Sequence, residues 1–226
     1  MRRWRRRLGF LLLLLLVLPP LTVVGAMLAY RVVQPPITPL QLIRLVEGHG
    51  FTRELRPLDQ ISPHLARAVI ASEDNFFCQH RGVDWAAFET EWQRWRRGER
   101  PRGASTITMQ LTKNLFLWPR RDHARKALEL AITPVVEALL SKERILEIYL
   151  NQVEFDSGVY GAQAAARHHF DKDADRLTPR EAAVLAALLP APLSWRPEDR
   201  RVQRQADRIL QRIPQLGPLL HCAPRP

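Results

Sequence analysis

Two acidic residues, Glu73 and Glu129, flank a stretch of the chain that is rich in hydroxyl, amide and cationic side chains. Carboxylates serve glycosyl chemistry because one can take a proton from a sugar hydroxyl while another positions or stabilises charge. Lysine and arginine nearby suit a phosphate leaving group. The stretch between the acids includes residues 103–114, GASTITMQLTKN. The combination favours a carbohydrate or phosphate site.

Both acids also have ordinary structural explanations. Glu73 follows an apolar segment with helical spacing and precedes two phenylalanines, which predicts a partly buried carboxylate with a raised pKa. Glu129 lies four residues after Arg125 and three after Lys126. On a helix this spacing gives a common intrahelical ion pair. The residues alone therefore leave a purely structural role open for Glu129.

The N-terminal segment predicts a membrane anchor. Residues 1–7 contain five arginines, and no charged residue occurs from Leu8 to Tyr30. About 20 apolar residues span a bilayer, and arginines before the span place the N-terminus in the cytoplasm. We expect a cytoplasmic tail at 1–7, a transmembrane helix at 8–30, and the remainder of this single-pass inner-membrane protein in the periplasm. The alternative is a cleaved signal peptide, with 8–18 as its apolar region and Pro19 and Pro20 in its favour.

The chain is basic and has only two cysteines. It carries 34 Lys and Arg against 23 Asp and Glu, a net charge of +11, which suits anionic headgroups or a phosphorylated substrate. No zinc-finger spacing or RNA-binding aromatic signature supports nucleic acid as a partner. Cys78 and Cys222 are too few for a disulfide framework, and the sequence leaves open whether they pair.

Apolar spacing predicts a mainly α-helical chain with almost no strand pattern. A helix over 63–72 would deliver Glu73 at its end. Asp84 would cap a helix whose aromatic side chains we expect in the core or in an interface, and 98–103 reads as a loop. We expect further helices from the N-cap Ser105 to Leu115, over 122–140 with a kink at Pro134, over 142–150, and from the capping box at Thr178 to Leu189. The expected divisions are a membrane-proximal linker at 31–60, a catalytic domain at 61–195 and a helical tail at 196–226.

Three motifs of the chain resemble those of glycosyltransferase family 51. They are EDNFFCQHRGVD at 73–84, GASTITMQLTKN at 103–114 and RKALE at 125–129, and further family segments match at 141–151, 160–165 and 177–186. The resemblance runs in order from about residue 66 to 192. It implies a lysozyme-like, mainly helical fold with a smaller membrane-associated jaw region. It also implies polymerisation of lipid II with inversion at the anomeric carbon and release of undecaprenyl diphosphate.

The same resemblance assigns roles to individual residues. Glu73 matches the family's catalytic base, and Glu129 its second catalytic glutamate. From the sequence we expect no metal ligand and no required cofactor, with Mg²⁺ or Mn²⁺ as candidate cations. The implied partners are lipid II, the growing glycan strand and the membrane, with other cell-wall synthesis and division proteins as further candidates. The implied substrate-binding residues are Asp74, Phe77, His80, Ser105, Thr106, Gln110, Lys113, Asn114, Arg121, Arg125 and Lys126.

Within the family, the motifs of this chain are most similar to those of the monofunctional enzymes. The chain ends before a transpeptidase domain could fit and has no Ser-x-x-Lys motif, so we expect a monofunctional enzyme. Met109 replaces a family glutamine, which we expect to remove one polar contact at the donor site, and His169 stands where tyrosine is usual. The other departures are Ala104, Leu128 and Gln163. Two other classes stay open, a lysozyme-like glycan hydrolase and a non-catalytic scaffold of the cell-wall machinery.

Overall fold

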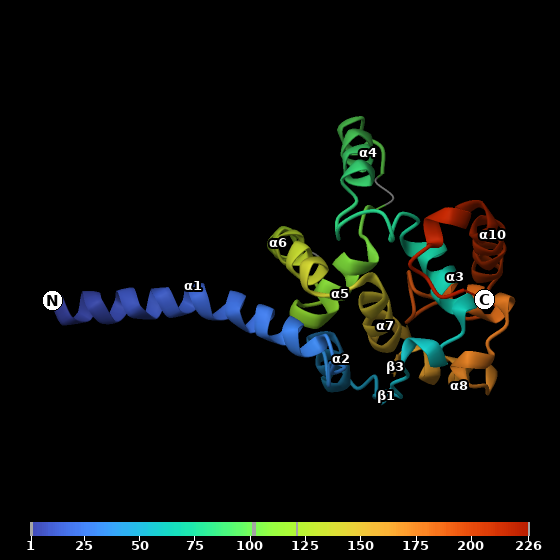
Figure 1. Cartoon of the computed structure of the whole chain (residues 1–226), viewed down its shortest axis with the longest axis horizontal. Coiled ribbons are helices and arrows are strands. Elements are labelled where there is room, and N and C mark those ends of the chain that lie inside the picture. The colour runs from blue at the N-terminus through green and yellow to red at the C-terminus, as the bar shows by residue number, and fades with distance from the viewer. Residues whose placement is uncertain (1, 101–102, 121, 226) are drawn as a thin grey trace.

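The computed structural model describes residues 2–100, 103–120 and 122–225, without the side chains of residues 2–3, 5–6 and 8–16. The prediction of a mainly helical chain is confirmed. Helix α1 (Arg2–Tyr30) extends away from a body formed by the remaining elements (Figure 1).

Helix α1 contains the segment predicted to be an anchor. It is one helix despite Pro19 and Pro20. Its end next to the body packs against α6 (His123–Leu139), and Met27 is fully buried. Over the described residues, no helix combines the length and the apolar character that crossing a bilayer requires. The anchor at 8–30 therefore stays a prediction.

The densest packing joins three helices on one side of the body. Helix α9 (Pro179–Leu188) packs against both α3 (Pro63–Glu73) and α10 (Arg200–Leu216). Residues 182–188 of α9 are all buried, and four of them are alanines. Because these side chains are small, α3 and α10 can both approach α9 closely. This packing fixes the position of α3 and therefore of Glu73 at its C-terminal end.

A second group surrounds α5 (Ile107–Phe116), which lies in the middle of the body (Figure 1). Helices α6 (His123–Leu139) and α7 (Lys142–Gln152) pack against it, and so does the short α2 (Pro39–Val46). Helix α2 was not predicted, because 31–60 was read as a linker. Its signal is a capping box at Thr38 and Gln41 with proline at the first helical position.

A small sheet also lies in a part where no strands were expected. The strands are β1 (Thr52–Arg53), β2 (Glu154–Asp156) and β3 (Val159–Tyr160). Their order in the sheet is β1-β3-β2, with β1 parallel and β2 antiparallel to β3. The β2–β3 turn needs glycine at 158, because its φ is +70° and a Cβ there would collide with the carbonyl oxygen of His49. Helix α8 (Ala162–Phe170) follows β3. The 3₁₀ turns of the chain are η1 (Leu58–Gln60), η2 (Ala174–Arg176) and η3 (Gly217–Leu220).

Side-chain caps explain most helix starts. Asp84 and Thr178 cap their helices as predicted, and Thr178 forms its capping box with Glu181. Asp122 is the N-cap of the helix that was predicted to begin there. The predicted N-cap Ser105 is wrong by one residue. The hydroxyl of Thr106 accepts from the backbone N–H of Met109, so α5 begins at Ile107.

Helix α4 (Trp85–Arg96) projects from the body (Figure 1), and none of its residues is buried. Trp85, Trp92 and Trp95 are 63%, 47% and 58% exposed. The expectation that these tryptophans form core is therefore wrong, and the expectation of an interface remains.

Cys78 and Cys222 form a disulfide bond. It ties the loop after Glu73 to the segment after η3, 144 residues later in the chain. The side-chain amide of Gln79 supports the same junction by donating to the carbonyl of Leu219 at 2.9 Å. The covalent link closes the core formed by α3, α9 and α10.

We expect replacement of both cysteines by serine to lower stability. A disulfide that closes a long loop typically contributes about 2–4 kcal/mol, which corresponds to a fall of roughly 5–15 °C in melting temperature for a domain of this size. Thermal melting in detergent of the oxidised protein and of Cys78→Ser/Cys222→Ser measures this. Reduction should lower the wild-type melting temperature and leave the double variant unchanged; equal melting of both oxidised proteins would contradict the prediction.

Candidate functional site

The carboxylate of Glu73 lies at the C-terminal end of α3 in a mostly buried, hydrogen-bonded environment. Gln110 Nε2 donates to its Oε2 at 2.9 Å, and Ser72 Oγ donates to its Oε1 at 3.2 Å. Burial raises the pKa of Glu73, while these two hydrogen bonds and the charge of Lys113 partly oppose the rise. The group is thus suited to accept a proton nearer neutral pH than an exposed glutamate would.

The side chain of Gln110 is itself held in place by a hydrogen bond from Tyr149. Its Oε1 accepts a hydrogen bond of 2.9 Å from the hydroxyl of Tyr149 on α7, whose side chain is fully buried. Burial and the nearby carboxylates raise the pKa of Tyr149 well above its usual value, so the phenol stays a donor. This fixes the amide orientation, with the NH₂ group facing Glu73.

The adjacent Asp74 positions the motif rather than facing solvent. Its buried carboxylate accepts from the backbone N–H of Ile107 at 2.9 Å and from His80 Nε2 at 2.9 Å. Because Ile107 is the first residue of α5, the contact also places negative charge at the positive end of that helix. Asp74 and His80, both predicted to bind substrate, thus join the end of α3 to the start of α5.

Gly82 completes this junction. Its φ of +87° is one that other residues rarely adopt, and a Cβ there would lie 2.9 Å from Cγ2 of Thr133, so a larger residue would be strained. Its carbonyl accepts a hydrogen bond of 2.5 Å from the hydroxyl of Thr106. Thr106, 3% exposed, therefore locks the start of α5 against the first motif.

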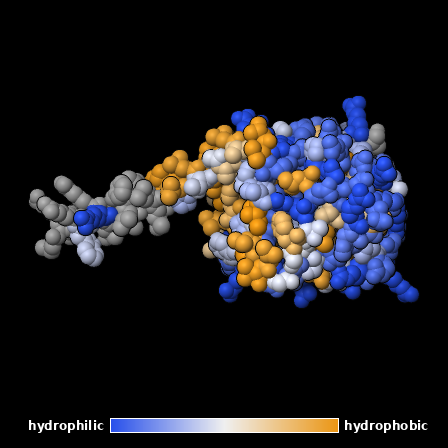
Figure 2. All heavy atoms as spheres, turned by 90° about the horizontal axis from the view of Figure 1, so that it is seen from below, coloured by the Kyte–Doolittle hydropathy of each residue, from blue (hydrophilic) through white to orange (hydrophobic). Residues whose placement is uncertain are grey.

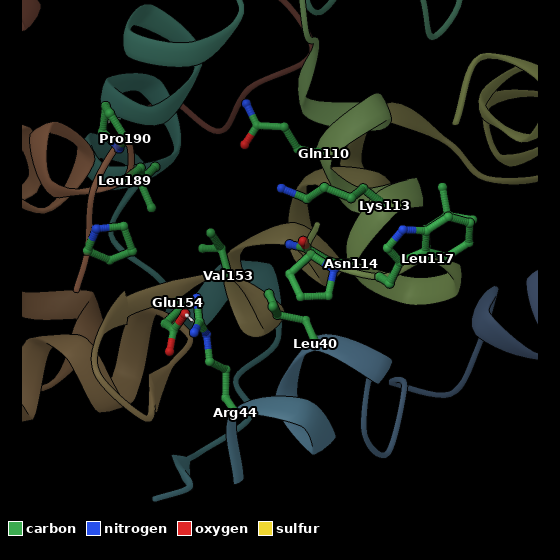
Figure 3. A pocket seen from close by; sticks show the side chains of 13 residues that line it. Leu40, Arg44, Gln110, Lys113, Asn114, Leu117, Val153, Glu154, Leu189 and Pro190 are labelled. Carbon is green, nitrogen blue, oxygen red and sulfur yellow. Dashed lines mark ion pairs between the residues drawn. The ribbon is translucent and has the colours of Figure 1, made fainter. Parts of the chain in front are cut away.

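A cavity of about 210 Å³ opens beside Gln110 and Lys113. Figure 3 shows both side chains pointing into it from α5, opposite Leu189 and Pro190. Asn114 also lines it, and its buried Oδ1 has no hydrogen-bond partner among the described residues. The volume is below the roughly 300–1,000 Å³ of a pocket that encloses a drug-sized ligand, so a larger substrate would extend beyond it.

Glu129 is the centre of a buried ion-pair cluster on α6. Arg125 Nη1 lies 2.5 Å from its Oε2 and Lys126 Nζ 2.7 Å from its Oε1, and the carboxylate is 2% exposed. Lys126 also donates to Ser105 Oγ at 2.9 Å. Glu129 therefore fixes the positions of both cations. Through the Lys126–Ser105 hydrogen bond it also helps to position the loop that precedes α5.

Three pockets adjoin around these groups. The first is the cavity of Lys113, the second is lined by the aromatic face of α4 with Ser105 and Lys126, and the third by Glu73, Asp74, Ser105 and Thr106. The second and third share Gly103–Ser105, and the Gln110–Glu73 hydrogen bond connects the third to the first.

Two predicted residues lie elsewhere than expected. Phe77 and Met109 are both 0% exposed, so Phe77 supports the site from the core and cannot touch a substrate in this structure. Met109 faces the interior, and its predicted loss of a polar donor-site contact is wrong for the same reason. Arg121, predicted to bind phosphate, lies outside the described residues.

Sequence reasoning missed several residues around the cavity. Arg44 of α2 lines it and pairs with the buried Glu154 of β2 at 3.7 Å, and burial raises the pKa of Glu154. Tyr149 could have been found from the sequence, because it lies within the segment 141–151 that resembles the family. Arg44 could not, because its segment was interpreted as a linker.

Comparison with known proteins identifies the family. A family model described as Transglycosylase matches residues 41–214, which is more than half of the chain. The chain belongs to the transglycosylase family.

Relatives of this transglycosylase share the name "Biosynthetic peptidoglycan transglycosylase". The protein from Caulobacter vibrioides is 47% identical over 86% of this chain and 84% of its own length. That from Rhodospirillum centenum is 51% identical over 79% and 78%, and that from Xanthomonas campestris 43% identical over 96% and 91%. The likeness thus extends over most of each protein.

Replacing Gln110 with leucine should raise the pKa of Glu73 further. The amide donates to the ionised carboxylate, and loss of a bond that favours the charged form raises a carboxyl pKa. Carboxyl-carbon NMR titration of the transglycosylase measures it. Tyr149→Phe should shift the pKa in the same direction by less.

Gln93→Leu is the matched control, because Gln93 donates to Glu89 on the exposed helix α4. It should leave the Glu73 titration unchanged. A Glu73 pKa that is the same in Gln110→Leu and wild type would show that this hydrogen bond does not stabilise the carboxylate.

Proposed function

We propose that this protein is a peptidoglycan glycosyltransferase that polymerises lipid II, with Glu73 as its general base. The supporting observation is the environment of Glu73: a mostly buried carboxylate with a raised pKa, oriented by Gln110 and close enough to Lys113 to feel its charge. Family membership and the names of the relatives support the same reaction class.

In the proposed reaction Glu73 takes the proton from the 4-hydroxyl of the acceptor N-acetylglucosamine. The oxygen attacks the anomeric carbon of the N-acetylmuramic acid at the end of the donor strand. The new C–O bond forms as the bond to phosphate breaks, the configuration inverts, and undecaprenyl diphosphate leaves with the electron pair. Base catalysis of this kind typically contributes roughly 10²–10⁴-fold.

The cations then act on the leaving group. The diphosphate carries its charge before and after cleavage, so Lys113, with Arg44 also lining the cavity, can stabilise it without a protonated acid. Glu129 acts through the cations that it holds, since both its oxygens are engaged by Arg125 and Lys126. A lysozyme-like hydrolase instead needs a protonated acid over the leaving oxygen and has no use for Lys113. A non-catalytic scaffold would need neither Glu73 nor Lys113.

The pair Glu73→Gln and Lys113→Ala should separate the two roles. Glu73→Gln should abolish polymer formation from lipid II, because the isosteric amide cannot accept the proton, yet spare binding of a phosphoglycolipid that mimics the donor. Lys113→Ala should weaken both, since a hydrogen bond to a charged group is worth about 1.5–3 kcal/mol, or roughly ten- to a hundredfold. Polymer gels and titration calorimetry give the two readouts.

Lys172→Ala serves as the matched control, because Lys172 pairs with Glu181 and lines none of the three pockets. A folded Glu73→Gln protein with wild-type polymer yield would exclude Glu73 as the base. Release of fragments from purified glycan would identify a hydrolase, and no product from either substrate would favour the scaffold. Repeating the assay with chelator, then with Mg²⁺ or Mn²⁺, tests the candidate cations.

We also propose that the chain is anchored by α1 in the inner membrane, with its jaw region on the bilayer and its catalytic domain in the periplasm. Hydrophobic side chains gather on the part of the body next to α1 (Figure 2). Leu42, Leu45 and Val46 of α2 are 52%, 45% and 82% exposed, and Val32 and Val33 beside them 83% and 57%. Exposed apolar patches of this kind mark membrane or protein contacts, and lipid II is a membrane-bound donor.

The anchor hypothesis predicts that the mature protein keeps its arginine-rich N-terminus and resists extraction by high salt. Intact-mass spectrometry of protein purified from membranes tests this. A mature chain that begins near Met27 would establish the cleaved signal peptide instead.

A further inference from the structure

A cluster of metal-ligating side chains lies outside the site described above. It joins Asp156, the last residue of β2, to His168 and His169 near the end of α8. One ligand atom from each of the three lies within 4.8 Å of the others. In Figure 1, α8 lies on the far side of the body from the free end of α1.

His169 presents a nitrogen with no partner. Its side chain is 6% exposed, and its Nε2 has no hydrogen-bond partner among the described residues. This nitrogen lies 4.0 Å from Oδ2 of Asp156, so it faces the cluster. A buried imidazole nitrogen without a hydrogen-bond partner is a common metal ligand.

Asp156 divides its two oxygens between different tasks. Oδ1 accepts from the backbone N–H of Ser157 and from Arg196 Nη1, both at 2.7 Å. Oδ2 faces the imidazoles, 3.3 Å from His168 Nε2 and 4.0 Å from His169 Nε2. Oδ2 is therefore the oxygen that can share an ion with the two imidazoles.

We propose that Asp156, His168 and His169 bind a divalent transition-metal ion of the zinc class. Ligand atoms about 2.1 Å from a tetrahedral zinc ion lie about 3.4 Å apart, close to the 3.3 and 4.0 Å found here. Two imidazoles with one carboxylate select zinc-like ions over Mg²⁺, which prefers oxygen ligands. Solvent completes the coordination from the cavity in front of the cluster, which Glu198 also lines.

The site is structural, because its ligands link separate elements. A bound ion ties β2 to the end of α8 and, through the Asp156–Arg196 pair, to the segment after α9. Glu154, the partner of Arg44 beside the Lys113 cavity, belongs to the same strand. Binding to the folded state alone stabilises it by mass action, so zinc should raise the melting temperature.

The test uses the full-length protein in detergent, with its purification tag removed and metal stripped by chelator. Zinc chloride is titrated in competition with a fluorescent chelator. We expect one ion per chain with a dissociation constant in the micromolar range or below, and a higher melting temperature with zinc but not with equal magnesium chloride. His168→Gln and His169→Tyr should each weaken zinc binding by more than about tenfold.

The two variants complement each other. His168 is 49% exposed on its side chain, so His168→Gln leaves the fold intact, and His169→Tyr introduces the residue usual at this family position. His123→Gln, which removes an exposed imidazole at the start of α6, is the matched control and should bind zinc as wild type does. Equal zinc affinity in wild type, His168→Gln and His169→Tyr would overturn the proposal, as would a loss in His123→Gln as large as in them.

Discussion

The buried carboxylate of Asp74 is the interaction on which the site depends. It accepts from the first backbone N–H of α5 and from His80, and so joins the end of one helix to the beginning of another. A buried charge is tolerable only when it is compensated in this way. Since Glu73 precedes Asp74 and Gln110 lies one turn into α5, the same contact sets the distance between the carboxylate of Glu73 and the amide that orients it. Gly82 and Thr106 reinforce the junction from the other side.

This arrangement explains why neighbours within one motif have different tasks. Along α5, Gln110, Lys113 and Asn114 line the cavity, whereas Met109, Leu111 and Thr112 are buried and do not line it, as the helical period requires. Glu73 faces the pockets, whereas Phe77, four residues later, lies in the core. The substitution at Met109 is thus a change in packing, and a methionine fills an irregular interior gap readily.

Much of the helical framework was predictable from the sequence, because caps and prolines are local signals. Asp84, Asp122 and Thr178 mark helix starts that the structure confirms. Between Ser105 and Thr106 the choice of cap could not be made, since both hydroxyls suit the position and only the contact with Gly82 favours the second. The strands are too short to show alternation, and the pairing of Cys78 with Cys222 depends on how α10 returns to α3. In the site, residue types predicted the chemistry, but the roles of Tyr149 and Arg44 arise from tertiary contacts that no local pattern contains.

The bond between Cys78 and Cys222 has a consequence for biogenesis. Under the proposed topology the chain crosses the membrane from its N-terminal side, so Cys78 enters the oxidising compartment long before its partner, 144 residues behind it. Disulfides form and persist in such compartments and are rare in the cytosol. Covalent closure of the loop that follows Glu73 therefore waits until α10 has been exported. The disulfide that stabilises the folded enzyme can therefore form only on the side of the membrane where its product is needed.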